Sequence, residues 1–184
     1  MNLRSQSGYS LIEMLVVMSI LGVVMSALTA LFVQSSNAQI DMNARFNAQS
    51  HARVALDRMR KDLHCAASAT SSSSTSVTVS SPCIAGSVLT WCTATVSGRV
   101  RLIRVVGASC DSTAAAYADD LVSGETYFAY QAPSTQSLAV LYVCIPVNPK
   151  KGATKATYAL TGTIAFRNST RTGTFAAATP PVCT

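Results

Sequence analysis

The chain has 184 residues and a formal net charge of +6, and only 12% of its residues are charged. An ordinary soluble domain carries about 25% charged residues. The 9 Gly and 6 Pro are too few for a collagen-like or elastic repeat, and a hydrophobic content of 49% argues against wholesale disorder. The length allows one domain of moderate size with an appendage.

The first predicted element is a membrane-spanning helix over Leu11–Val33. This run is apolar apart from Glu13 and a few hydroxyl residues, and no residue from Met14 to Ile40 is charged. At about 1.5 Å per residue, a helix of this length covers roughly 34 Å, enough for a hydrocarbon core of about 30 Å. Because Arg4 is the only charged residue before the run, the positive-inside rule predicts a cytoplasmic N-terminus.

Two simpler interpretations of this run are a secretory signal peptide and a plain signal anchor. A signal peptide has an apolar run of about 7–15 residues, and the present run is longer. Neither interpretation explains Glu13, because a carboxylate near the start of a membrane helix costs a few kcal/mol without a partner. No Lys or Arg lies in the following turns. We therefore expect the partner to come from another chain or from a new amino terminus nearby.

Residues 8–16 read GYSLIEMLV and resemble the N-terminal signature of type IV pilins and type II secretion pseudopilins. That family has a short basic leader ending in Gly, an aromatic first mature residue, a Glu four residues later and a long apolar helix. The resemblance implies that residues 1–8 are a leader, which a prepilin peptidase removes between Gly8 and Tyr9 before it methylates the Tyr9 amine. It also implies that residues 9–33 are a transmembrane helix and that Glu13 serves filament assembly.

A filament gives the isolated carboxylate a partner. In helices stacked with a small axial offset, the Tyr9 amine of one subunit approaches Glu13 of the next, and this pairing fixes the register of assembly. The expected partners are the prepilin peptidase, other pilins and minor pilins, and an inner-membrane assembly platform. The expected location is the inner membrane, crossed once with the head outside, and a periplasmic or extracellular filament after assembly.

An amphipathic continuation of the helix is predicted over residues 34–66, which contain neither Pro nor Gly. Its large apolar residues share about one face at 3.6 residues per turn. They are Met42, Phe46, Leu56, Met59 and Leu63. The final turns, Val54 to Leu63, are expected to pack on a sheet. The two histidines, His51 and His64, have no nearby carboxylate or Cys-x-x-Cys and are interpreted as surface or capping residues.

Residues 67–184 are predicted to form an extracytoplasmic β-rich head. Residues 68–81 are low in complexity and predict a flexible loop ending in a short strand, whereas Asp111–Gly124 predicts a loop and Gly173–Thr184 an irregular tail. The predicted strands are Ser76–Val79, Val88–Val96, Arg99–Val106, Thr126–Gln131, Leu138–Val147 and Tyr158–Arg167. A long N-terminal helix followed by strands predicts an α+β fold, with an antiparallel sheet packed on the helix as in pilins.

The helix end and parts of the head carry a second, more degenerate resemblance. Residues 52–66 (ARVALDRMRKDLHCA) and the strand that begins GRVRLIRVVG resemble PilW-like minor pilins and J-type minor pseudopilins. This resemblance implies a minor subunit that primes or caps a type IV pilus or a type II secretion pseudopilus. The alternative is a DNA-binding minor pilin of a competence or uptake pilus.

All six cysteines follow the predicted membrane helix, and no Cys-x-x-Cys occurs. An even number in an oxidising compartment indicates disulfides, and six cysteines allow 15 pairings. The hypothesis preferred here links Cys65 to Cys83 across the Ser-rich loop and Cys183 to the sheet; free buried thiols are the alternative. The six disulfide candidates are Cys65, Cys83, Cys92, Cys110, Cys144 and Cys183.

No catalytic, phosphate-binding or metal-binding motif stands out, so we expect neither an enzyme nor a cofactor. The head carries eight basic and four acidic residues from position 67 onward, a balance of +4. A modest positive balance of this kind is either an ordinary solvated surface or one that attracts DNA phosphates. The candidate DNA contacts are Arg99, Arg101, Lys150 and Lys151.

Overall fold

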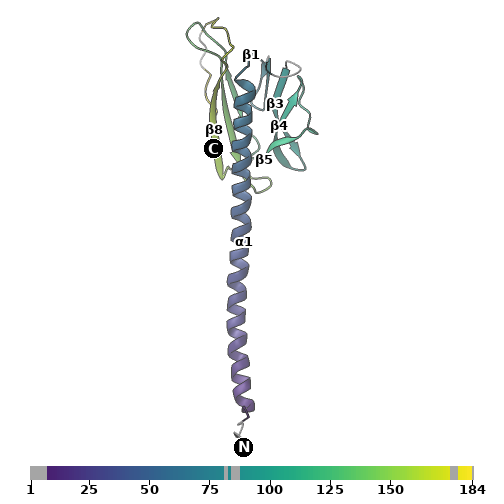
Figure 1. Ribbon diagram of the computed structural model, residues 1–184, viewed down its shortest axis with the longest axis vertical. Helices are drawn as coiled ribbons and strands as arrows, with labels where there is room; N and C mark the ends of the chain where they lie inside the picture. The colour runs from purple at the N-terminus through teal and green to yellow at the C-terminus, as the bar shows by residue number, and fades with distance from the viewer. Residues whose placement is uncertain (1–7, 81–82, 84–87, 175–177, 184) are drawn as a thin grey trace, which may run out of the picture. The chain divides into compact units, whose positions relative to one another are not determined.

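The structure is a computed structural model that describes residues 8–80, 83, 88–174 and 178–183. It divides into two compact units, Met1–Asn43 and Ala44–Thr184, each described separately below. A single helix, α1 (Leu11–Leu63), belongs to both units (Figure 1). With the antiparallel sheet that follows it, this helix confirms the predicted α+β, pilin-like fold.

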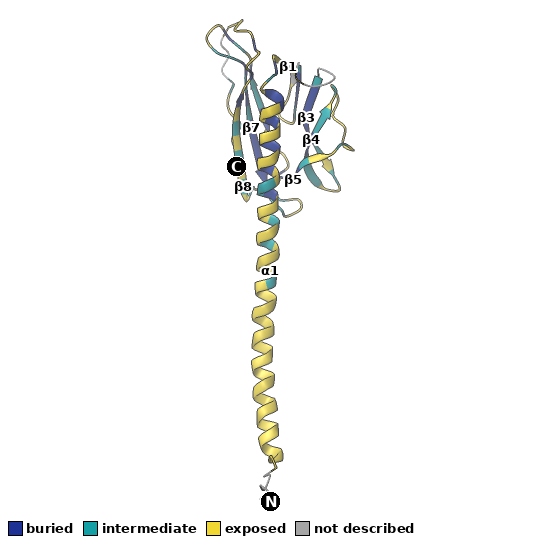
Figure 2. Cartoon of the chain, in the orientation of Figure 1, coloured by how far each residue is buried: buried dark blue, intermediate teal, exposed yellow. Residues whose placement is uncertain are grey.

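The first unit is the apolar beginning of α1. Every residue from Leu11 to Val33 is exposed (Figure 2), and by length and composition this helix contains one stretch able to cross a membrane. The hydroxyls of Ser19 and Ser26 each donate a 2.8 Å hydrogen bond to the backbone carbonyl three residues earlier, and Thr29 donates to the carbonyl of Met25. The hydroxyl groups of this stretch are therefore satisfied within the helix itself, as an apolar surrounding requires.

The second unit contains an eight-stranded sheet in which every pair of neighbouring strands is antiparallel. Its strands are β1 (Ser68–Ser72), β2 (Ser76–Ser80), β3 (Val88–Val96), β4 (Arg99–Val106), β5 (Ala116–Leu121), β6 (Phe128–Gln131), β7 (Val140–Val147) and β8 (Tyr158–Ala165). The β3–β4 hairpin has the predicted bounds. Its two-residue turn has positive φ at both Ser97 (53°) and Gly98 (74°), the backbone sign that a right-twisted hairpin requires.

Strand β7 joins the two parts of the sheet. One edge of β7 pairs with β8 along its whole length, while the other edge pairs with β6 at its beginning and meets β5 only through Leu121 and Val147. The β1–β2 turn lies against β6, because the N–H groups of Tyr127 and Phe128 both donate to the carbonyl of Ser74. The sheet is therefore curled, with β8 at its outer border (Figure 1).

The core lies between the final turns of α1 and the concave side of this sheet. The buried helix residues recur at helical spacing, and Leu56 packs so closely on β8 that a Cβ at Gly162 would lie 2.8 Å from its Cδ1 atom. The buried residues of α1 are Ala48, Ala52, Ala55, Leu56, Met59, Asp62 and Leu63. Trp91 and Phe166 are the largest side chains that the sheet side contributes to the core.

The apolar residues that share one face of the helix are not all buried: Met42 and Phe46 are 72% and 70% exposed, and the buried face begins at Ala48. Two predictions about the head were wrong. Strand β5 occupies a segment predicted to be a loop, and β1 lies in the Ser-rich segment predicted to be flexible. The structure's helix ends at Leu63, three residues before the predicted end.

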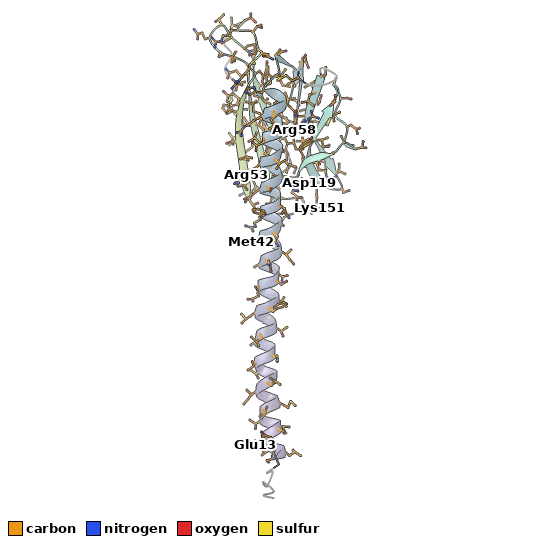
Figure 3. All side chains as sticks on the ribbon, in the orientation of Figure 1. Glu13, Met42, Arg53, Arg58, Asp119 and Lys151 are labelled. Carbon is orange, nitrogen blue, oxygen red and sulfur yellow. A yellow bond between two sulfur atoms is a disulfide. The ribbon has the colours of Figure 1, made fainter. Side chains whose placement is uncertain are left out.

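A charge cluster connects the end of α1 to β4. Asp62 is only 6% exposed, and its carboxylate accepts hydrogen bonds from Arg104 Nε (2.6 Å) and Arg104 Nη2 (3.3 Å). The more exposed Arg58, labelled in Figure 3, lies 3.4 Å from the same carboxylate. The hydrogen bond to Asp62 raises the pKa of Arg104 above its usual value. Asp62 and Arg104 therefore compensate for each other's desolvation.

We predict that Asp62→Ala lowers the free energy of unfolding by about 3 kcal/mol, because it leaves the largely desolvated Arg104 guanidinium, whose side chain is 15% exposed, without its carboxylate. The matched control is Asp57→Ala on the same helix, whose side chain is 68% exposed and pairs with Arg60. This control should cost less than about 1 kcal/mol. Urea unfolding of a fragment beginning at Gln34 measures both values. Equal losses for the two variants would contradict a structural role for the buried pair.

Candidate functional site

The beginning of α1 forms one half of a capping box, the hydrogen bond from the Ser10 N–H to the Glu13 carboxylate. Ser10 directly precedes the helix, and Glu13 occupies its third position. The backbone N–H of Ser10 donates to Glu13 Oε2 at 3.4 Å, and the Glu13 N–H donates to the Ser10 carbonyl at 3.1 Å. The sequence S-x-x-E is the pattern that places a carboxylate over an otherwise unpaired N–H at a helix start. Glu13 therefore has a local role in addition to any role in assembly.

The position of Glu13 in the first turn also suits the helix dipole, whose positive end lies there (Figure 3). We expected the carboxylate's partner to come from another chain or from a new amino terminus nearby, but the Ser10 amide already supplies one hydrogen bond to it. The bond is long, and among the described residues no Lys, Arg or His forms an ion pair with Glu13. Since Ser10 follows Tyr9, removal of residues 1–8 would leave this cap in place.

The predicted cleavage position lies just before the helix. Gly8 and Tyr9 are both exposed, and the Tyr9 side chain is 83% exposed. A Cβ placed on Gly8 would meet no atom within 4 Å. Among the described residues, the structure therefore leaves this segment open to an enzyme. Residues 1–7 of the expected leader lie outside the described residues.

The structure brings the six cysteines together in three disulfides. Their Cα–Cα distances are 5.9 Å, 6.1 Å and 5.7 Å, within the range that a disulfide spans. The first connects the end of α1 to the segment after β2, the second connects β3 to the segment after β4, and the third connects β7 to the C-terminal segment. The pairs are Cys65–Cys83, Cys92–Cys110 and Cys144–Cys183.

Three of the four candidate DNA contacts lie near one another, and the four are not equivalent. Arg99 forms an ion pair with Asp120, and Arg101 Nε lies 2.9 Å from Asp119 Oδ1. Lys150 and Lys151 are exposed in the β7–β8 loop. Together with Arg99 and Asp120, these two lysines line a small cavity of about 30 Å³. The structure thus gathers three of the four cations, while each arginine already has a carboxylate partner.

No cluster of three or more His, Cys, Asp or Glu side chains suited to a metal occurs among residues 8–80, 83, 88–174 and 178–183. His51 lines a hollow together with Asp119 and Asp120, and His64 follows the last turn of α1. The site that the geometry singles out is therefore the first turn of α1. The signal that sequence reasoning missed there is the capping box from Ser10 to Glu13.

Comparison with known protein families locates a match at this same segment. Residues 3–29 match the family model described as the prokaryotic N-terminal methylation motif. No curated protein and no solved structure matched the chain. The motif supports a protein of the type IV pilin and pseudopilin family, which is structural rather than catalytic. It implies processing by prepilin peptidase and assembly with other pilins, and with the apolar helix it fits an inner-membrane anchor.

Proposed function

We propose that the chain is a minor pilin or pseudopilin, a structural subunit that primes or caps a type IV pilus or a type II secretion pseudopilus. The observation that carries the proposal is the methylation motif over residues 3–29 on a helix whose apolar start is wholly exposed. In this proposal residues 1–8 are the leader, residues 9–33 the membrane helix, residues 34–66 its amphipathic continuation and residues 67–184 the head outside the cytoplasm.

Two features of the chain support a subunit of an assembly. A fully exposed apolar surface from Leu11 to Val33 is stable only in lipid or against other helices. The small residues Ser19, Gly22, Ser26 and Ala27 recur along it and permit close helix approach, and a Cβ at Gly22 would meet no atom within 4 Å. The resemblance of residues 52–66 to PilW-like and J-type subunits supports the minor role.

The experiment that tests the proposal is mass spectrometry of the mature N-terminus. In cells with a prepilin peptidase, we expect a chain that begins at Tyr9 and carries a methylated amine. Gly8→Val should leave the leader attached, because a side chain at this position obstructs the peptidase while contacting no described atom of the chain. An intact Met1, or a cut elsewhere than after Gly8, would contradict the proposal.

We predict that the charge of Glu13, and not its capping bond, is needed for entry into filaments. Glu13→Gln keeps an oxygen acceptor for the Ser10 N–H, whereas Glu13→Leu removes both the charge and the acceptor. Both variants should therefore be incorporated much less than the parent, as measured by immunoblotting of sheared filaments. If Glu13→Gln enters filaments as readily as the parent and only Glu13→Leu fails, the glutamate acts as a helix cap.

DNA binding on the same scaffold is the second candidate, and one observation favours it: Arg99, Lys150 and Lys151 line one cavity. The arginine pairs with Asp119 and Asp120 oppose it, because they neutralise two of the four predicted contacts. If the head binds DNA, the two lysines are therefore expected to contribute more than the two arginines.

A gel-shift assay of the fragment from Gln34 onward, at two salt concentrations, separates the two candidates. DNA binding predicts retention that weakens with added salt and that Lys150→Gln/Lys151→Gln reduces more than Arg99→Gln/Arg101→Gln. A purely structural subunit shows no retention even at low salt. The lysine variant is a suitable probe because both side chains are exposed.

A further inference from the structure

Strand β8 is an open edge of the sheet. It pairs with β7 from Tyr158 to Ala165, and no described strand pairs with its other side. The Phe166 N–H donates to the Ala139 carbonyl, and β7 and β8 keep one register along their length. Because main-chain groups alternate in direction along an antiparallel strand, the N–H and C=O groups of the even-numbered residues of β8 point toward β7. The N–H and C=O groups of the odd-numbered residues therefore point away from the sheet.

These outward residues are accessible, and β8 itself carries none of the residues that normally protect an edge. Ala159, Thr161, Thr163 and Ala165 are all exposed, and β8 (YALTGTIA) contains no charged residue and no Pro. Exposed edges are usually blocked by Lys, Pro, a bulge or a covering segment, since an unblocked edge pairs with other chains. The opposite border of the sheet is different, because β1 carries an irregularity between Ala69 and Ser71.

A hollow lies beside the same edge. It has a volume of about 430 Å³ and is lined by Thr161, Thr163, Tyr142, Arg60 and the Pro180–Pro181 segment, among others. Recognition by strand addition uses main-chain hydrogen bonds for affinity and pockets of this kind for alternate side chains of the added strand. The edge and the hollow together provide both parts of such a site.

The charges at the two ends of β8 select the partner. The segment from residue 126 to residue 184 contains five basic residues and no acidic residue. Lys155 precedes β8 by three positions, and Arg167 follows it by two. A second copy of β8 added antiparallel would bring Lys155 of one copy near Arg167 of the other, and like charges placed opposite each other are destabilising. This arrangement disfavours self-pairing and favours a strand with acidic ends.

We propose that the free edge of β8 is a strand-addition site for another protein, one that offers an extended, uncharged segment flanked by acidic residues. The added strand forms main-chain hydrogen bonds with residues 159 to 165 of β8. Its acidic ends lie near Lys155 and Arg167, and its alternate side chains enter the hollow beside Tyr142. This interaction surface goes beyond the proposed role in filament priming, because it does not involve the first turn of α1.

The test uses the full chain in detergent micelles and two fluorescent peptides with the same alternating Thr-Val centre. One peptide is flanked by Asp residues and the other by Lys residues, and fluorescence anisotropy measures their affinities. The Asp-flanked peptide should bind about tenfold more tightly at low salt, and added salt should reduce this difference. The double variant Lys155→Gln/Arg167→Gln, which changes two exposed side chains, should remove the preference.

The edge itself is tested with Thr163→Pro, which removes an N–H group that points away from β7. Pro is tolerated at such an edge position but prevents pairing there. This variant should weaken binding of the Asp-flanked peptide at least tenfold, whereas Thr163→Ala, which keeps the N–H, should bind like the parent. Circular dichroism of each variant verifies that the sheet is retained.

Three results would overturn the proposal. The first is that neither peptide binds, or that both bind equally well. The second is that Thr163→Pro folds as the parent does and binds without loss. The third is that the parent forms a dimer that Thr163→Pro dissociates, which would make a second copy the occupant of the edge.

Discussion

The close contact between the final turns of α1 and the sheet is the constraint on which the head depends. Three of the buried helix residues are alanines, and at Gly162 the absence of a side chain admits Leu56 against β8. Because protein interiors are packed as densely as organic crystals, small residues on one surface are needed where large ones approach from the other. This packing fixes which face of the helix is buried, and so which residues of the helix remain available for other contacts. On the same face, Asp62 accepts a hydrogen bond from Arg104, which connects the helix to β4.

The disulfides stabilise segments that lie outside this packed core. Each of them ties a segment outside the helix–sheet core to an ordered element: the segment at Cys83 to the end of α1, the segment at Cys110 to β3, and the C-terminal segment at Cys183 to β7. In the chain-entropy model, a crosslink that closes about 15 residues contributes roughly 3 kcal/mol. Crosslinks of this kind suit an oxidising compartment, in agreement with a head outside the cytoplasm in the proposed function.

The sequence predicted the elements whose signals are local. The β3–β4 hairpin was predicted with its observed bounds because two period-two runs flank the residue pair Ser97-Gly98, and the structure shows the positive φ that such a turn requires. Strand β5 was missed because adjacent acidic residues such as Asp119 and Asp120 are typical of loops. Their partners, Arg101 and Arg99, lie on β4 and can be identified only once the pairing of β4 with β5 is known. Phe46 fits the helical period but is exposed, since periodicity alone does not say where a buried face begins. The cap between Ser10 and Glu13 is a local signal too, since the pattern S-x-x-E marks a helix start in the sequence.

The charges of the head divide into those that are paired inside the fold and those that face outward. Asp119 and Asp120 pair with arginines of β4, and Asp111 accepts two hydrogen bonds from Thr113, which lower its pKa. Residues 67–125 carry three basic and four acidic residues, so their balance is −1, whereas residues 126–184 carry +5. The positive balance of the head therefore belongs to the segments that flank β8 and not to the arginines of β4. Nucleic acid and an acidic polypeptide would both be attracted to that side, but only a polypeptide offers main-chain groups at the spacing of a β-ladder. The open backbone of β8 is thus the feature by which this surface discriminates between two partners of the same charge.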